Sequence, residues 1–195
     1  MGKQYPSIEP QHREFVERQH IFFTGSAAAE GRVNVSPKDR ASLRILSESQ
    51  VAYLDLTGSG NESAAHLRAT GRMTMMFCAF EGAPLVLRLY GRGRVLLRGT
   101  PEYGELLSSA FENQERPGAR QIILLDIDLV QTSCGFGVPE FSYVGERPTL
   151  TRWAENKGEE GLKEYWRRKN ALSIDGLPTG ICDNEAAEVP ENTLA

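Results

Sequence analysis

The chain has 195 residues, and its 40% hydrophobic and 25% charged fractions are ordinary for one folded domain with a substantial core. These fractions exclude disorder over the whole chain. A formal net charge of −4 disfavours a nucleic-acid-binding function, because such domains usually carry a basic excess.

The cysteines and the N-terminal residues indicate the compartment. Cys78, Cys134 and Cys182 are odd in number and scattered, and no pair of them has metal-ligand spacing. The first residues hold no apolar run of the signal-peptide kind, and no stretch is long enough to span a bilayer. We therefore expect a cytoplasmic protein with reduced thiols, no metal site and no membrane contact.

In chain order, the first part of the sequence predicts a helix, four short strands and a second helix. The first helix is expected over 9–19. Gly, Ser, Pro and Asp separate the strand-like runs that follow, at 20–24, 32–36, 43–46 and 51–56. Asn61 is a suitable N-cap for a helix that runs to about Thr70, and Gly71 is suited to end it.

The second part predicts two longer β segments, at 72–80 and 85–98, joined by a hairpin-like turn at 81–84. The elements expected next are a helix over 101–113, a strand over 121–130 and a last strand near Phe141. A charged helix is then expected over about 150–170, with an interruption at Gly158 or Gly161.

Many strands with few helices favour a barrel that has helices packed on its outside. The predicted fold class is therefore mainly β with flanking helices. We expect a single domain over 1–182, including a C-terminal helical region at about 149–170. An acidic tail with few large apolar residues follows over 183–195 and is expected to be disordered.

The segment 85–98 carries an unusual concentration of arginine. If it is a regular strand, one face holds Arg88, Tyr90, Arg92, Arg94, Leu96 and Arg98, because alternate side chains share a face. The other face holds Leu87, Leu89, Gly91, Gly93, Val95 and Leu97. Four arginines without an acid suit an anionic ligand or an acidic partner, and pairing with carboxylates elsewhere is an equal alternative. A bulge at either glycine would redistribute these faces.

A glycine-rich loop, Thr57-Gly58-Ser59-Gly60-Asn61, lies between a predicted strand and a predicted helix. Backbone N–H groups, hydroxyls and a helix N-terminus together favour a phosphate, and a plain turn with a cap is equally compatible. The glycine spacing matches neither a dinucleotide fingerprint nor a P-loop. Because Glu62 would repel a phosphate from the first helical turn, its side chain has to point away if the loop binds one.

Other candidates for chemistry are sparse. Ser36 and Lys38 end a predicted strand and could reach a phosphate or a ring edge, although strand ends are commonly polar. The three histidines lack metal-binding spacing, and a lone cysteine such as Cys134 is more often a small buried residue than a nucleophile. No side chain is an obvious reagent, which points to a cofactor that brings its own reactivity.

Several short motifs resemble, in their order, the pyridoxamine 5′-phosphate oxidase-like flavin-binding family. They lie at 31–38, 52–62, 65–67, 76–82, 87–91, 131–139 and 175–180. The resemblance implies a split β-barrel homodimer that holds FMN in a groove between its subunits. It also implies that the region bearing Trp153, Trp166, Arg167 and Arg168 approaches the cofactor.

The resemblance assigns the expected cofactor-binding residues in three groups. The strand that lines the flavin ring and ribityl chain supplies Arg32, Asn34, Val35, Ser36 and Lys38. The phosphate-side loop and helix start supply Ser59, Gly60, Asn61 and His66, and a polar strand position supplies Arg88. Catalytic residues stay unassigned.

The chain departs from the oxidase proper at two places. Glu62-Ser63 stands where the oxidase has a basic Arg-Lys pair, and no histidine follows His66 to form the C-terminal Arg-x-His segment. We therefore do not expect pyridoxamine phosphate as the substrate. The sequence predicts an FMN-dependent oxidoreductase that takes a small-molecule substrate and an electron donor. A deazaflavin- or haem-binding relative and a non-catalytic flavin-binding protein stay open as alternatives.

Overall fold

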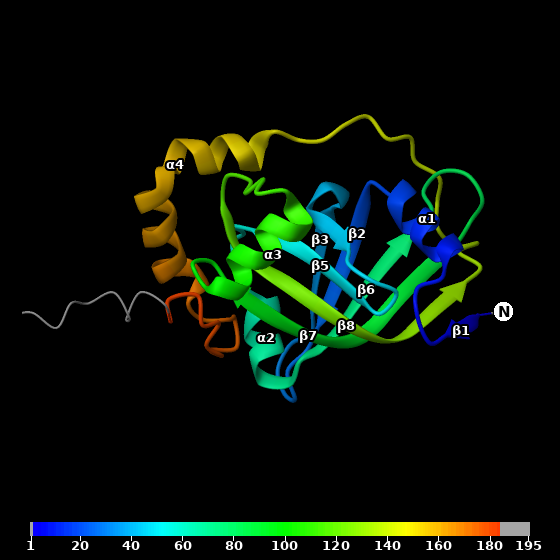
Figure 1. The fold of residues 1–195 in the computed structure, drawn as a ribbon, viewed down its shortest axis with the longest axis horizontal. Coiled ribbons are helices and arrows are strands. Elements are labelled where there is room, and N and C mark those ends of the chain that lie inside the picture. The colour runs from blue at the N-terminus through cyan, green and yellow to red at the C-terminus, as the bar shows by residue number, and fades with distance from the viewer. Residues whose placement is uncertain (1, 184–195) are drawn as a thin grey trace, which may run out of the picture.

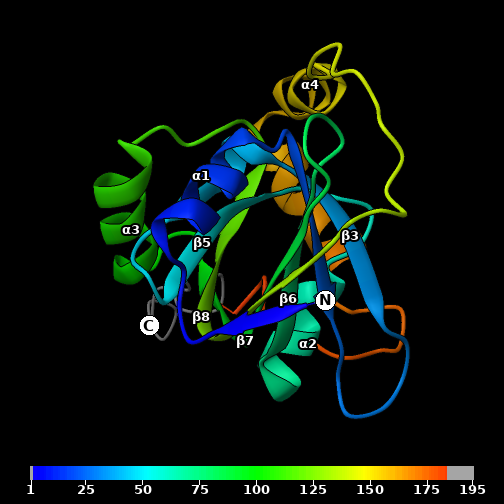
Figure 2. The same ribbon diagram turned by 90° about the vertical axis from the view of Figure 1, so that its right-hand side faces the viewer.

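The computed structural model describes residues 2–183, in which a strongly curled antiparallel sheet forms a half-barrel flanked by helices (Figures 1 and 2). The sheet has eight strands in the order β3-β2-β6-β7-β8-β5-β4, with β1 also paired to β8. The strands are β1 Lys3–Tyr5, β2 Ile21–Ser26, β3 Asn34–Asp39, β4 Leu43–Ile45, β5 Gln50–Leu56, β6 Arg72–Cys78, β7 Val86–Leu97 and β8 Ala119–Ser133. The predicted fold class, mainly β with flanking helices, is confirmed.

The helices lie around the sheet (Figures 1 and 2). They are α1 Pro10–Arg18, α2 Glu62–Thr70, α3 Pro101–Phe111 and α4 Thr149–Tyr165, with a 3-10 turn at Arg40–Ser42 and a π-helical turn at Trp166–Asn170. Gly158 has non-helical angles (φ 65°, ψ 173°), so it is the glycine that interrupts the charged helix. None of the helices in this part of the chain is long and apolar enough to cross a membrane.

Strand β8 connects two hydrophobic cores. Ile123 and Leu125 pack inside the curl of the sheet with Phe22, Phe77 and Leu89, among others. Side chains on the other face of β8 pack beneath α3: Ile122 and Leu124 lie with Tyr103 and Phe111. Because both faces of the first part of this strand are buried, residues 122–125 form a run of apolar residues with no alternation.

The register between β7 and β8 shifts between Tyr90 and Gly91, and the residue left without a partner is Asp128, so the bulge lies in β8 and not in the arginine-rich strand. Leu87 and Leu89 before the shift and Val95 beyond it all pack on the inner core, whereas Leu96, on the same face as the arginines, joins the core beneath α3. The alternation predicted for 85–98 therefore holds across the shift, with Leu87, Leu89 and Val95 on one apolar face.

Carboxylates and carbonyl oxygens of this chain engage most of the arginines of the segment 85–98. Arg92 donates to the Thr70 carbonyl (2.8 Å), and Arg94 pairs with Glu102 (3.4 Å). Arg98 pairs with Glu115 (2.8 Å) and with Glu159. Of the two interpretations of this strand, internal pairing is the one that the structure favours.

Other sequence predictions fail for physical reasons. The strand expected near Phe141 is absent: residues 134–148 run in an extended path from β8 to α4 without pairing as a strand (Figure 1). The short strand β1 was not predicted, since three residues give too brief a pattern. Asn61 precedes α2 as expected, but its side chain makes no cap hydrogen bond. The tail over 184–195 lies outside the described residues.

The C-terminal helical region is fastened to the sheet by a buried indole. The Nε1–H of Trp166 donates to Thr57 Oγ1 (2.8 Å), and this hydroxyl in turn donates to the Gly118 carbonyl (2.7 Å). The contact joins the end of α4 to the loop after β5, although 109 positions separate the two residues.

We expect Trp166→Phe to lower the free energy of unfolding by about 1–2 kcal/mol, because it removes the indole donor from a buried hydrogen bond. The matched control is Trp153→Phe, which keeps an aromatic ring at the edge-on contact with Tyr165. Urea denaturation of both variants measures the difference. Equal stabilities of the two variants would contradict the role given to this hydrogen bond.

Candidate functional site

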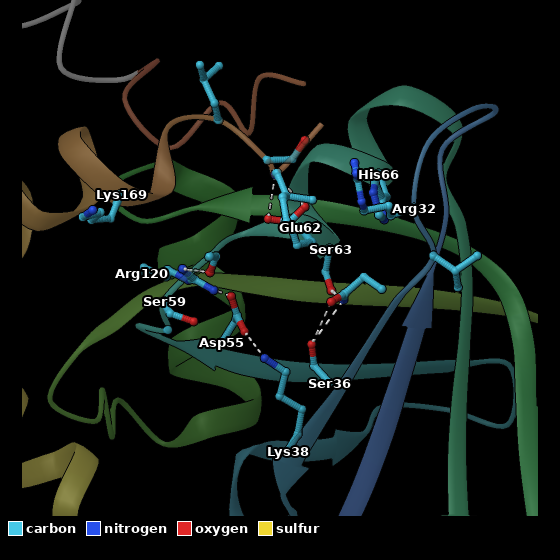
Figure 3. A pocket seen from close by; sticks show the side chains of 17 residues that line it. Arg32, Ser36, Lys38, Asp55, Ser59, Glu62, Ser63, His66, Arg120 and Lys169 are labelled. Carbon is cyan, nitrogen blue, oxygen red and sulfur yellow. Dashed lines mark hydrogen bonds and ion pairs between the residues drawn. The ribbon is translucent and has the colours of Figure 1, made fainter. Parts of the chain in front are cut away.

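A pocket of about 680 Å³ opens between β3, the end of β5, the loop 57–61, the start of α2 and the segment 169–174 (Figure 3). Seven of the residues that the sequence assigned to a cofactor line it: Arg32, Asn34, Ser36, Lys38, Ser59, Gly60 and His66. These residues come from two separate parts of the sequence, and the curl of the sheet brings them together.

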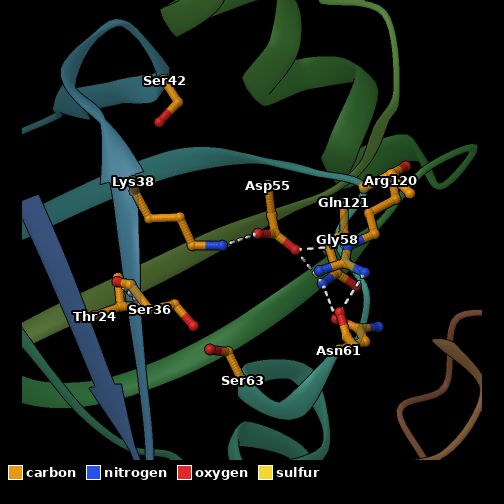
Figure 4. Close-up of polar contacts among 12 residues, drawn as sticks. Thr24, Ser36, Lys38, Ser42, Asp55, Gly58, Asn61, Ser63, Arg120 and Gln121 are labelled. Carbon is orange, nitrogen blue, oxygen red and sulfur yellow. Dashed lines mark hydrogen bonds and ion pairs between the residues drawn. The ribbon is translucent and has the colours of Figure 1, made fainter. Parts of the chain in front are cut away.

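The floor of the pocket is built around the buried carboxylate of Asp55, which is 1% exposed (Figure 4). Lys38 Nζ donates to its Oδ1 at 2.7 Å. Arg120 Nε and Gln121 Nε2 each donate to its Oδ2 at 2.8 Å. Lys38 and Arg120 also line the pocket, so this network places two cations at its floor.

Two opposing effects act on the pKa of Asp55. Burial alone would raise the pKa, but the positive charges of Arg120 and Lys38 and the hydrogen bonds outweigh it and hold the pKa well below its usual range. Since an unfolded aspartate has a pKa of about 3.9, the carboxylate contributes its full stabilisation above roughly pH 5. That contribution is lost as the pH falls below the pKa of Asp55 in the unfolded chain and approaches its lower pKa in the folded protein.

We therefore expect the stability of the wild-type protein to fall as the pH is lowered from 5 to 2, and Asp55→Asn to fall less steeply over this range. The variant has no carboxyl group to protonate at this position, so one source of proton uptake on unfolding is gone. Urea midpoints measured at several pH values give the two slopes. Parallel curves would show that the Asp55 carboxyl has an ordinary pKa in the folded protein.

Side chains that are far away in the sequence hold the loop 57–61 through hydrogen bonds to its carbonyl groups. Arg120 Nη1 donates to the Gly60 carbonyl (2.9 Å) and to Asn170 Oδ1 (2.8 Å). Asn170 Nδ2 donates to the Gly58 carbonyl (3.1 Å). The start of β8 and the π-helical turn thus fix two carbonyl groups of the glycine-rich loop.

Hydroxyl and amide groups line the pocket wall next to Lys38. Asn34 Nδ2 lies 3.2 Å from both Ser36 Oγ and Ser63 Oγ, and so joins β3 to α2. His66, one turn further along α2, is 1% exposed, and its Nδ1 lies 3.1 Å from Ser26 Oγ. The Asn34 amide and the hydroxyls of Ser36 and Ser63 supply donors and acceptors without adding charge.

The C-terminal segment closes one side of the pocket. Both carboxylate oxygens of Glu62 accept from the Ile174 N–H, at 3.0 and 3.1 Å. The guanidinium of Arg32 pairs with Asp175, and the Arg32 backbone N–H donates to the same carboxylate (2.7 Å). Glu62 is therefore held by residue 174, but it also lines the pocket, so its side chain does not point away as the interpretation of the loop as a phosphate site requires.

Three predicted residues do not line the pocket. Val35 is 66% exposed, since it alternates with Asn34 and Ser36 along β3. Asn61 is 2% exposed and accepts from Gln121 Nε2 (2.7 Å), which places it beneath the loop.

Arg88 contacts Ser133 Oγ (3.2 Å) near the far end of β8. The expected convergence of Arg88 with Ser59 on one cavity is therefore not found within a single chain.

Sequence reasoning missed Asp55, Arg120, Lys169 and Asn170. The first two had a visible signal, since each is a charged residue at the end of an apolar strand run, and a buried charge needs a partner. Lys169 and Asn170 gave no such signal, because they lie in a charged helical segment where polar residues are ordinary.

The sequence matches the family model of pyridoxamine 5′-phosphate oxidase over residues 8–134, which is more than half of the chain. The chain belongs to the pyridoxamine 5′-phosphate oxidase family. It is 41% identical over 192 residues to the pyridoxamine 5′-phosphate oxidase family protein ustO of Aspergillus flavus. That match covers 89% of this chain and 76% of the relative.

Solved structures of low sequence identity agree on the fold. A pyridoxamine 5′-phosphate oxidase-like protein from Lactobacillus delbrueckii superposes with a TM-score of 0.50 at 16% identity, covering 65% of this chain and 94% of the other. HupZ from Group A Streptococcus gives 0.51 at 15% identity, covering 63% and 91%. The resemblance and the split β-barrel predicted from the sequence are confirmed.

Proposed function

We propose that this member of the pyridoxamine 5′-phosphate oxidase family is an FMN-dependent oxidoreductase that holds the cofactor's phosphate in the pocket above Asp55. The observation that carries the proposal is the donor set. Lys38 and Arg120 line the floor, Ser59 and Ser63 line the walls, and α2 begins at the rim. Cations, hydroxyls and a helix N-terminus are the groups that bind phosphate.

The size and charge of the pocket agree with this cofactor class. Ligand pockets usually measure about 300–1,000 Å³, and the volume of about 680 Å³ falls within that range. Four cations line the pocket against two carboxylates: Arg32, Lys38, Arg120 and Lys169 against Asp55 and Glu62. The surplus of positive charge favours an anionic ligand.

Bound FMN would accept a hydride or electrons from an external reductant and pass them to a small-molecule substrate. The chain itself supplies binding and electrostatics: Lys38 and Arg120 place positive charge in a partly enclosed site, where charges interact more strongly than in water. The segment 172–174 covers one side of the site and limits the access of water. The donor and the acceptor of electrons are an external reductant and a small molecule that we do not name.

A homodimer is part of this proposal. The edge strand β3 and the adjoining segment 172–174 expose aliphatic side chains around the pocket: Val33 (72% exposed), Val35 (66%), Leu172 (58%) and Ile174 (71%). A second subunit that packs there would cover these side chains and would be the route by which Arg88 takes part in a cofactor site. Light scattering of the purified protein tests for the dimer.

Cytoplasmic residence is also proposed. Its support is that Cys78, Cys134 and Cys182 form no disulfide within residues 2–183. Such thiols suit a reducing compartment.

The direct test is the visible spectrum of the purified protein, followed by calorimetric titration with FMN and with riboflavin. We expect a yellow protein that binds FMN more tightly than riboflavin, because riboflavin lacks the phosphate. Ser59→Ala is expected to weaken FMN binding, and stopped-flow mixing with NADH or NADPH is expected to bleach the bound flavin. A colourless protein that binds no FMN would overturn the proposal.

The same preparation separates the proposal from its rivals. Mass spectrometry of the released ligand distinguishes FMN from a deazaflavin coenzyme or haem. A flavin that stays oxidised with every reductant tried would indicate a binding protein without turnover.

A further inference from the structure

Burial of the Asp55 carboxylate beneath the pocket costs free energy. Asp55 lies on β5 directly after Leu54, in a strand whose inner residues are apolar, and it is 1% exposed. Burying a charged group costs free energy even when it is paired, and apolar replacements of buried ion pairs are often neutral or stabilising. Stability alone therefore does not account for an aspartate at this position.

The two oxygens of Asp55 contact different cations. Oδ1 accepts from Lys38 on β3 (2.7 Å), and Oδ2 accepts from Arg120 at the start of β8 (2.8 Å). In Figure 4 the two cations approach the carboxylate from opposite sides. One carboxylate thus fixes the distance between two positive groups that belong to different strands.

Both cations retain donors for a ligand. The Lys38 ammonium has three N–H groups and gives one of them to Asp55. Arg120 uses Nε for Asp55 and Nη1 for Gly60 and Asn170, whereas its Nη2 makes no hydrogen bond within residues 2–183. Since both side chains line the pocket, these remaining donors are available to an anion there.

We infer that Asp55 is a positioning residue that holds Lys38 and Arg120 as a two-armed clamp for an anionic group of the ligand. The clamp itself follows from the geometry of the three side chains. The inference rests on the proposed function only where it identifies the anion as the phosphate of FMN.

The negative charge of Asp55 and its role in fixing the position of Lys38 have opposite effects on anion binding, so they predict opposite results when Asp55 is neutralised. Charge alone predicts tighter anion binding, because a negative group leaves the floor of the pocket. Position predicts weaker binding, because Lys38 has a flexible stem and loses its carboxylate partner, while Gly60 and Asn170 still hold Arg120. A flexible ammonium must be ordered again whenever the ligand binds, which weakens binding. We expect this weakening to exceed the gain in affinity from removing the negative charge of Asp55.

The test measures binding of FMN, riboflavin and pyrophosphate to the full chain by calorimetry. Asp55→Asn and Lys38→Gln are each expected to weaken FMN and pyrophosphate binding about tenfold and to leave riboflavin binding unchanged. In the double variant, the loss should stay within about twofold of the Lys38→Gln loss, because Asp55 acts through Lys38. Equal or tighter FMN binding to Asp55→Asn, or fully additive losses, would overturn the inference.

Two further variants keep the test decisive. Asp55→Glu retains the charge but shifts the carboxylate by one methylene, so position predicts weaker binding and charge alone predicts no change. It also replaces Asp55→Asn if that variant does not fold. Asp39→Asn is the matched control, because it removes an aspartate charge paired with Arg116 (2.6 Å) outside the pocket lining. Its anion affinity is expected to stay within twofold of the wild type.

The outcomes separate the inference from the proposed function. If the wild type binds pyrophosphate but no FMN, and Asp55→Asn loses pyrophosphate binding, the proposed function is contradicted and the inference about the clamp is supported. If the wild type binds FMN while Asp55→Asn binds it equally well, the proposed function is supported and the inference about the clamp is contradicted. If the wild type binds neither anion, both are overturned.

Discussion

Arg120→Met is expected to lower the free energy of unfolding by about 3–5 kcal/mol and to abolish measurable FMN binding. The substitution removes the buried partner of Asp55 and leaves a carboxylate without one of its compensating charges, which is the costly way to break an ion pair. It also releases the Gly60 carbonyl and Asn170 Oδ1, so the glycine-rich loop loses its support. For a chain of this length the thermal midpoint should fall by roughly 10 °C.

The control for this variant is Arg94→Met. Arg94 pairs with Glu102 at 3.4 Å, with side chains that are 52% and 70% exposed. Exposed pairs contribute about 0–1 kcal/mol, so the control should unfold within about 0.5 kcal/mol of the wild type. Denaturant titration of both variants decides the matter, and similar losses in the two would contradict the structural role given to Arg120.

Gly91→Ala is expected to destabilise the fold by about 3 kcal/mol or more. A Cβ atom at this position would lie 1.9 Å from the carbonyl oxygen of Asp126 and 2.8 Å from its carbonyl carbon. The neighbour is backbone of the central strand β8, so the collision cannot be relieved by turning a side chain. The two longest strands of the sheet have to separate locally, and hydrogen bonds of their ladder are lost.

Gly104→Ala provides a control that carries the same chemical change. Gly104 lies inside α3, and no atom lies within 4 Å of the Cβ that alanine would add. Alanine is the better helix former, so this variant should gain about 0.5–1 kcal/mol. Thermal unfolding of the pair therefore yields shifts of opposite sign. If Gly91→Ala left the stability unchanged, β7 and β8 would have to be further apart than they are in the structure.

Local patterns were sufficient to predict most elements, but not the contacts among them. The helix after Asn61 was predictable because Gly71 takes a left-handed conformation (φ 69°) that ends it, as glycine permits. The bulge at Asp128 in β8 was not, since it depends on how β7 pairs with this strand and no local pattern in the sequence marks it.

The candidate site shows the same limit. Lys38, Ser59 and His66 were assigned through family resemblance, and the pocket brings all three together. Asp55 was missed because its importance lies in pairing with Arg120, which is 65 positions away. Ion pairs at this separation follow from the topology of the sheet, and no local periodicity reports them.

The fastening of residue 170 to the glycine-rich loop has a consequence for biosynthesis. Asn170 contacts the Gly58 carbonyl across 112 positions of the chain. A ribosome therefore completes every strand of the barrel before it adds the residue that supports this loop. We expect nascent chains that end before this residue to collapse around the two cores yet to be unable to retain a cofactor, so that loading follows translation.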